Sequence, residues 1–104
     1  MIKHIAIYFL KEKDREENLA ILEKRLHRME KEIPFAVAFY SGADCIRRMH
    51  RGVPGVPEIG DFAHVIDFRD EADVRKYSIC PAHLSMVDDV AESLEKVVGI
   101  DIPY

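Results

Sequence analysis

The sequence predicts an α+β fold of the ferredoxin-like type, whose elements follow the order β-α-β-β-α-β. Short apolar runs rich in β-branched and aromatic residues predict strands at 2–10, 35–41, 61–69 and 97–102. Longer stretches with apolar residues three and four positions apart predict helices at 14–33 and from Pro81 to about Lys96. The chain of 104 residues therefore fits a single domain, 1–104, with one antiparallel sheet and its helices on one face.

The first strand, residues 2–10, is apolar on both sides. Alternation along the strand divides its side chains into two sets, namely His4, Ala6 and Tyr8 on one face and Lys3, Ile5, Ile7 and Phe9 on the other. Helices cover only one of these faces, so the second apolar face needs another layer. An identical subunit is the simplest source of that layer, which predicts a homodimer formed sheet against sheet through Ile5, Ile7 and Phe9.

Residues 14–33 are predicted to form a long amphipathic helix. Its apolar stripe consists of Leu19, Leu22, Leu26, Met29 and Ile33. Asp14 is expected to cap the first turn, with Glu17 three residues later as its capping-box partner. Pro34 disfavours a helical conformation at the residue before it, so the helix is expected to end at Ile33.

The second strand, residues 35–41, leads into a long loop. Residues 42–60 hold four of the five glycines and two of the five prolines, which is typical of a loop rather than a regular element. A basic cluster lies within it, formed by Arg47, Arg48, His50 and Arg51. We interpret this cluster as a solvated surface, with binding of an anionic ligand as the alternative.

The second half of the chain repeats the strand-helix-strand order. After the strand at 61–69, Asp70 is expected to cap a short helix that runs to about Tyr77. Pro81 suits the first turn of the next helix, where its missing N–H is not needed. The inward stripe of that helix is predicted to be His83, Val87, Val90 and Leu94. Residues 97–102 complete the sheet.

Composition and charge argue against several classes of protein. Lys and Arg total 15 against 19 Asp and Glu, a formal net charge of -4, whereas nucleic-acid binding needs a basic footprint. No apolar run is long enough to span a bilayer, and Lys3 and His4 interrupt the first apolar stretch, which argues against a signal peptide. We therefore expect a cytoplasmic protein without a membrane or nucleic-acid partner, whose cysteines, Cys45 and Cys80, are free thiols.

Three segments carry a resemblance to a known family. MIKHIAIYFL at the start, DFAHVIDFRDEADVRKY in the middle and SICPAHLSMV after it resemble the stress-responsive A/B barrel, or Dabb, family of dimeric α/β barrels. The most specific matches are the Lys3-His4 pair, His64 and residues 77–83. Family members often have a His-Pro-Ala-His motif in the last of these, and Cys80 here replaces its first histidine. The resemblance implies a ferredoxin-like subunit that pairs face to face into a barrel-like homodimer.

The resemblance does not name an activity, because the family is functionally mixed. Some members are stress-induced proteins without assigned chemistry, and one plant member is an olivetolic acid cyclase, which closes a linear polyketide by aldol condensation. Our first hypothesis is a homodimeric stress-responsive protein with no assigned chemistry or with a small apolar ligand. The second is a cofactor-independent enzyme acting on a carbonyl-bearing apolar substrate. A monooxygenase-like relative is a third and weaker alternative.

Three side chains are candidates for catalysis. His83 lies on the inward helix stripe, where a neutral imidazole can act as a general base, and the resemblance implies the same role. The resemblance also matches His4 to a catalytic histidine and Tyr77 to a tyrosine that holds or polarises a substrate carbonyl. Each has a structural alternative: a hydrogen bond to backbone or water for His83, a hydrogen bond across the sheet for His4, and packing for Tyr77. An apolar cavity lined by all three favours an enzyme, whereas a filled core excludes one.

Other kinds of site find less support. His64 matches a common family position, but we interpret it as a structural hydrogen-bonding residue outside the catalytic set. Cys80 and His83 have a C-x-x-H spacing, but no second pair completes a zinc site, so no metal is expected. A nucleophilic Cys80 with His83 as its base is a weaker alternative. The segment RGVPGVPEIG has the wrong spacing for a dinucleotide or phosphate loop, so no cofactor is expected.

Overall fold

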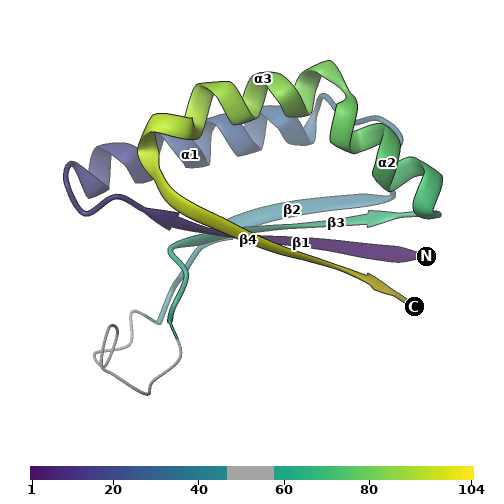
Figure 1. The fold of residues 1–104 in the computed structure, drawn as a ribbon, viewed down its shortest axis with the longest axis horizontal. Coiled ribbons are helices and arrows are strands. Elements are labelled where there is room, and N and C mark those ends of the chain that lie inside the picture. The colour runs from purple at the N-terminus through teal and green to yellow at the C-terminus, as the bar shows by residue number, and fades with distance from the viewer. Residues whose placement is uncertain (47–57) are drawn as a thin grey trace.

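The computed structural model describes residues 1–46 and 58–104 and shows the predicted ferredoxin-like α+β fold. The strands are β1 (Ile2–Leu10), β2 (Ala38–Ala43), β3 (Phe62–Phe68) and β4 (Leu94–Pro103). The helices are α1 (Arg15–Glu30), α2 (Glu71–Ile79) and α3 (Pro81–Val90), followed by the short 3₁₀ helix η1 (Ala91–Ser93). Figure 1 shows these helices gathered over one face of the sheet. The basic cluster predicted at 47–51 lies outside the described residues.

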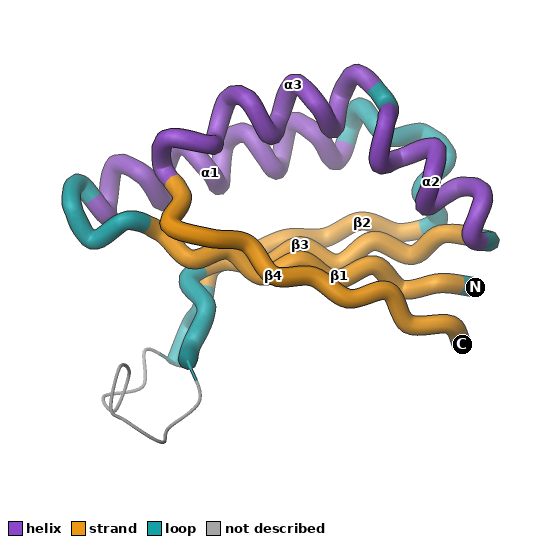
Figure 2. The backbone as a smooth tube through the Cα atoms, viewed as in Figure 1, coloured by secondary structure: helices purple, strands orange, loops and turns teal. Residues whose placement is uncertain are grey.

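The sheet has the strand order β2-β3-β1-β4 (Figure 2). Every neighbouring pair is antiparallel. Ala6 of β1 is paired with His64 of β3 on one side and with Gly99 of β4 on the other. Directly paired residues project from the same face of a sheet, so this register decides which side chains meet beneath the helices. It also places His4 opposite Asp101 of β4.

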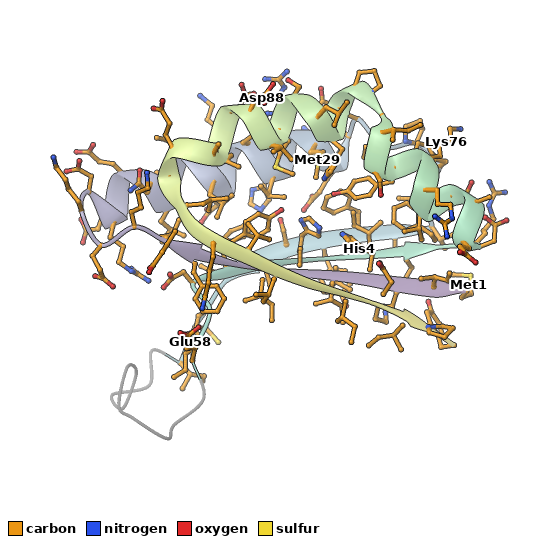
Figure 3. All side chains as sticks on the ribbon, in the orientation of Figure 1. Met1, His4, Met29, Glu58, Lys76 and Asp88 are labelled. Carbon is orange, nitrogen blue, oxygen red and sulfur yellow. The ribbon has the colours of Figure 1, made fainter. Side chains whose placement is uncertain are left out.

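The hydrophobic core lies between the sheet and the helices, where Figure 3 shows side chains from both layers converging. On α1, Leu22, Leu26 and Met29 are fully buried, as the predicted stripe requires. The core is completed from the sheet and the other helices by a set that includes Phe62, Ile66, Phe68, Met86 and Val90. Each such side chain contributes about 1.5–3 kcal/mol by leaving water, so this layer holds the site in place.

Both ends of α1 differ from the prediction. Asp14 has a left-handed backbone with φ 58° and its side chain makes no capping hydrogen bond, so the predicted capping box with Glu17 is wrong. A capping side chain needs an extended backbone, which a left-handed residue does not provide. At the other end the helix stops before residue 33, because the last turn tightens and the Glu32 N–H bonds to the Met29 carbonyl at 2.8 Å.

Strand β2 begins at Ala38 rather than at residue 35. Phe35 packs against the core before the chain reaches the sheet, and its ring stacks on that of Phe68 with centroids 6.1 Å apart. The first backbone hydrogen bond to β3 is donated by Val37 to the carbonyl of Asp67 at 2.8 Å. The alternating residues at 35–41 therefore belong to two elements. The first of them pack against the core before the strand, and the rest form the start of β2.

The last helix and strand also divide at a different point from the prediction. The structure ends α3 at Val90 rather than Lys96, and β4 begins at Leu94 rather than Val97. Leu94 is paired with Leu10 of β1, so pairing with the central strand replaces the last predicted helical turn. The start signals in this half are confirmed: the Asp70 carboxylate accepts from a backbone N–H of α2 at 2.9 Å, and Pro81 opens α3.

Two further predictions concern cysteines and membranes. Cys45 is exposed and Cys80 half-buried, and neither is in a disulfide. In residues 1–46 and 58–104, no helix is both long and apolar enough to cross a membrane.

Candidate functional site

An apolar cavity of about 400 Å³ lies between the sheet and the helices α2 and α3. This volume falls within the range of small-molecule sites. Its apolar wall consists of Ala6, Met86, Val87, Val90, Ala91, Leu94, Val97 and Gly99. Its polar groups belong to His4, Tyr8, His64, Tyr77 and His83. Val87 of α3 and Val97 of β4 are 43% and 46% exposed, so the cavity opens between this helix and the edge strand of the sheet.

His83 is positioned by the break between α2 and α3. Cys80 has an extended backbone and ends α2, and Pro81 starts α3. In the first turn of α3, His83 Nδ1 lies 3.0 Å from the carbonyl oxygen of Ser78. A carbonyl only accepts, so Nδ1 carries the proton and Nε2 keeps a lone pair. Burial lowers the pKa of His83 below its usual 6.5, which leaves the ring neutral at pH 7.

His4 is positioned by the pairing of β1 with β4. Figure 3 shows His4 between the sheet and the helices. Its Nδ1 lies 2.6 Å from Oδ1 of Asp101, and a carboxylate accepts, so Nδ1–H donates to it and Nε2 is left for another partner. The His4 ring centroid is 5.3 Å from that of Tyr77 and 5.3 Å from that of His64. Asp101 thus orients His4, a function that only the strand register reveals.

His64 and Tyr8 form a buried pair on the same face. His64 is 1% exposed, and its Nδ1 lies 3.0 Å from the Tyr8 hydroxyl. Burial, together with repulsion from His4 and His83, lowers the pKa of His64 to about 3. Burial also raises the pKa of Tyr8 above its usual value of 10. At neutral pH this pair is therefore an uncharged imidazole and an uncharged phenol.

Two buried polar atoms at the cavity, His64 Nε2 and the Tyr77 hydroxyl, have no hydrogen-bond partner among the described residues. Tyr77 is 1% exposed, and its ring centroid lies 4.5 Å from that of His83. Burial raises the pKa of Tyr77 above 10, so its hydroxyl keeps its proton. Buried polar groups nearly always have a partner in folded proteins. These two atoms are therefore the natural contacts for a polar group that enters the cavity.

The buried His64 predicts acid sensitivity of the fold. Its pKa is about 3 in the folded protein and 6.5 in the unfolded chain, so below pH 6.5 the unfolded state binds more protons. Stability should be fully present above pH 6.5 and should fall by about 2 kcal/mol between pH 6.5 and 5 from this group. Urea unfolding at these two pH values measures the loss, and His64→Gln should show a smaller one. Equal losses in both proteins would contradict this assignment.

The structure places His83, His4 and Tyr77 around the same cavity. An apolar cavity on the helix side is present, so the filled-core alternative is wrong. For His83 the structural alternative also holds in part, because one ring nitrogen bonds to the backbone. The catalytic roles of the three remain predictions. Tyr8 and His64 line the same cavity, although neither was predicted to belong to the site. For Tyr8 the strand alternation, which places it on the same face as His4, could have indicated this position.

Cys80 lies outside the lining of the cavity. It is half-buried and packs against the core. Among the residues that the structure describes, no group of three or more His, Cys, Asp or Glu is arranged to hold a metal ion. The polar side chains that the chain supplies at the cavity are imidazoles and phenols.

The open face of the sheet, opposite the helices, is apolar. The register places on it a set of side chains from three strands, namely Ile5, Ile7, Tyr40, Val98, Ile100 and Ile102. Ile100 is 58% exposed and Tyr40 57%. Lys3 Nζ lies 2.7 Å from Oδ1 of Asp67, so this charged pair on the face is already matched. Such a surface is typical of a protein interface.

Phe9 does not fit the predicted interface. It is only 8% exposed, and the Lys96 ammonium lies 4.7 Å from the centre of its ring. The pairing of β1 with β4 shifts register between Phe9 and Leu10, which brings both side chains into buried positions. Phe9 therefore has little surface left for a partner, and the open face depends on Ile5 and Ile7 instead.

The sequence profile of the Stress responsive A/B Barrel Domain matches residues 2–104. The chain belongs to the Dabb family. This match confirms the predicted resemblance, which covered nearly the whole chain with residues 42–60 as its weakest part. No curated protein matches the Dabb chain significantly by sequence.

Solved structures share the fold of this Dabb chain. A dimeric ferredoxin-like protein of unknown function from Thermobifida fusca matches with a TM-score of 0.77 and 22% identity, over 99% of this chain and 90% of its own. A protein from Arabidopsis thaliana matches with a TM-score of 0.75 and 25% identity, over 100% and 95%. A hydroxynitrile lyase from Passiflora edulis matches with a TM-score of 0.74 and 16% identity, over 97% and 90%. Dimers and an enzyme thus occur on this fold.

Proposed function

We propose that this Dabb protein binds an apolar carbonyl compound in its cavity and removes a proton from the carbon next to the carbonyl, without a cofactor. The observation that carries the proposal is an apolar cavity of about 400 Å³ with a neutral histidine at its wall. His83 meets the two requirements of a general base, because its Nδ1–H is held by Ser78 and its Nε2 has a free lone pair.

The other polar groups suit the same reaction. As Nε2 of His83 takes the proton, the electron pair of the C–H bond moves toward the carbonyl oxygen, which gains negative charge. The protonated hydroxyl of Tyr77 is a donor for that oxygen. The enolate carbon then takes back a proton from His83 or attacks a second carbonyl of the same molecule. In the second case a C–C bond forms as the C=O π bond breaks, and the resulting alkoxide takes the proton from His83. His4, held by Asp101, orients the substrate beside Tyr77.

We also propose that the protein is a homodimer that joins the open faces of two sheets. The described residues 1–46 and 58–104 leave the apolar set on this face exposed, and similar folds are described as dimeric. Burial of four such side chains per subunit at about 1.5–3 kcal/mol each would supply a large driving force. The cavity lies on the other side of the sheet, so each subunit keeps its own site.

A ligand-binding protein without turnover is the second candidate, because the same cavity would hold a ligand in both cases. Exchange of hydrogen for deuterium separates the two. Hexanophenone, a phenyl alkyl ketone, has an apolar body and acidic hydrogens next to its carbonyl. In D₂O with the protein, mass spectrometry should show deuterium entering that position faster than in buffer alone. Binding without faster exchange would leave only the second candidate.

The pH dependence of this exchange has a defined sign. The base must be neutral, and the pKa of His83 lies below 6.5. We therefore expect the rate above the buffer background to rise with pH through a midpoint below 6.5 and to level off by about pH 7. Initial rates of deuterium uptake between pH 5 and 8 provide the measurement. A rate that still increases steeply above pH 7.5 would exclude His83 as the base.

A further inference from the structure

The buried pair of Tyr8 and His64 has two possible hydrogen-bonding arrangements. If the Tyr8 O–H donates to Nδ1, the neutral ring carries its proton on Nε2, and one polar atom of the pair stays without a partner. If Nδ1–H donates to the Tyr8 oxygen, both Nε2 and the hydroxyl hydrogen lack a partner. The hydrogen-bond partner of the Tyr8 hydroxyl among the described residues is His64 Nδ1. The first arrangement leaves fewer buried groups unpaired and is therefore favoured.

We infer that Tyr8 fixes the tautomer of His64, so that Nε2–H of His64 and the hydroxyl of Tyr77 form two uncharged donors for the carbonyl oxygen of a neutral ketone. Both residues line the cavity, and both atoms are buried and lack a partner within the described residues. The two rings are perpendicular neighbours, with centroids 6.4 Å apart. Tyr8 is a positioning residue in this arrangement, because it acts through His64.

This arrangement also selects the charge of the ligand. The two donors carry no net charge at neutral pH, since the pKa of His64 is far below 7 and that of Tyr77 far above it. A carboxylate entering the apolar cavity would lose its hydration without meeting a cation at these donors. A ketone loses less hydration and gains both hydrogen bonds. The inference rests on the proposed function for the carbonyl ligand and adds its class, an apolar neutral ketone.

The tautomer is measured directly by long-range ¹H–¹⁵N correlation spectra of the histidine rings at pH 7. The signals of His64 are assigned by their absence in His64→Gln. We expect Nε2 to have the shift of a protonated nitrogen in the wild type, and Tyr8→Phe to abolish this preference. A wild-type His64 protonated on Nδ1 would overturn the inference without any need for the variant to fold.

The ligand class is measured with three probes: hexanophenone, hexylbenzene, which has CH₂ in place of the carbonyl, and 6-phenylhexanoate, which is charged. Hexanophenone should bind the wild type roughly five- to thirtyfold more tightly than hexylbenzene, the value of one or two hydrogen bonds. The carboxylate should bind most weakly. Tyr8→Phe should reduce the preference for the ketone about fivefold and leave hexylbenzene binding unchanged.

Tyr104→Phe is the matched control, because it removes the same atom from an exposed tyrosine outside both the cavity lining and the apolar set on the open face. It should bind all three probes as the wild type does. An unchanged ketone preference in Tyr8→Phe, tighter binding of the carboxylate, or no binding of the ketone would each overturn the inference. Failure of the proposed function is distinct, since it would leave the tautomer and the ketone preference intact while hexanophenone shows no accelerated exchange.

Discussion

His83→Ala should lower the rate of protein-dependent deuterium exchange into hexanophenone by about 10²–10⁴-fold, the usual contribution of a general base. The His83 imidazole lines the cavity and combines three properties of a base. Nε2 has a free lone pair, the hydrogen bond to Ser78 fixes the tautomer, and the pKa is lowered. Alanine removes all three and keeps the helix, since it favours helical backbone. Initial exchange rates at pH 7.5, with the background in buffer subtracted, measure the effect.

His27→Ala is a matched control, since it removes an imidazole from the exposed surface of α1. Its exchange rate should equal that of the wild type. His83→Ala should also bind hexylbenzene about as well as the wild type, which shows that the cavity has kept its shape. An unchanged exchange rate in His83→Ala would end the assignment of the base. A loss of folding together with unchanged exchange in the folded fraction would favour the structural alternative for His83.

Ile7→Asp should convert the proposed homodimer into monomer or aggregate. Ile7 lies on the open face between the paired residues Val98 and Ala63. In a two-fold interface the change places two carboxylates in an apolar contact, so the dissociation constant should rise by at least roughly 10³-fold. Sedimentation equilibrium across the micromolar range gives the mass of each protein in solution.

Ile100→Asp tests the same face without disturbing the chain around Ile7, whose side chain lies close to Gly60. Ile100 is 58% exposed, so the variant should fold and should also lose the proposed dimer. Ile21→Asp is the control, because it introduces the same charge at an exposed isoleucine of α1. A wild-type mass of one chain at every concentration would refute the proposed homodimer, as would dimers in both open-face variants.

The order of elements was predictable because each one carries its own periodicity. Leu22, Leu26 and Met29 recur at helical spacing and are fully buried on α1. The signals at Asp70 and Pro81 were also local, and both are confirmed. Predicted element boundaries were wrong where pairing with a distant strand outweighed a local preference. Leu94, for example, pairs with Leu10 instead of continuing a helix. The capping prediction at Asp14 was wrong for a local reason, because the left-handed backbone of this residue prevents its side chain from capping the helix.

The candidate site was predictable only in part. Strand alternation placed His4 and Tyr8 on one face, and the helix stripe together with the family resemblance singled out His83. His64 was left out because a histidine in a strand gives no sign of whether its nitrogens find partners. Asp101 was missed because it lies almost a chain length away from His4 and meets it only through pairing of the first and last strands.

The sequence by itself determined the fold class, the family and two apolar faces on the sheet, because these depend on local periodicity and on residue patterns. The tertiary structure alone decided that the space under α3 stays open as a cavity. It also decided that one polar atom each of His64 and Tyr77 lacks a partner among residues 1–46 and 58–104. Packing of side chains from distant segments sets such volumes and hydrogen bonds. Their values depend on the register of β1 with β3 and β4, which joins strands that lie far apart in the sequence.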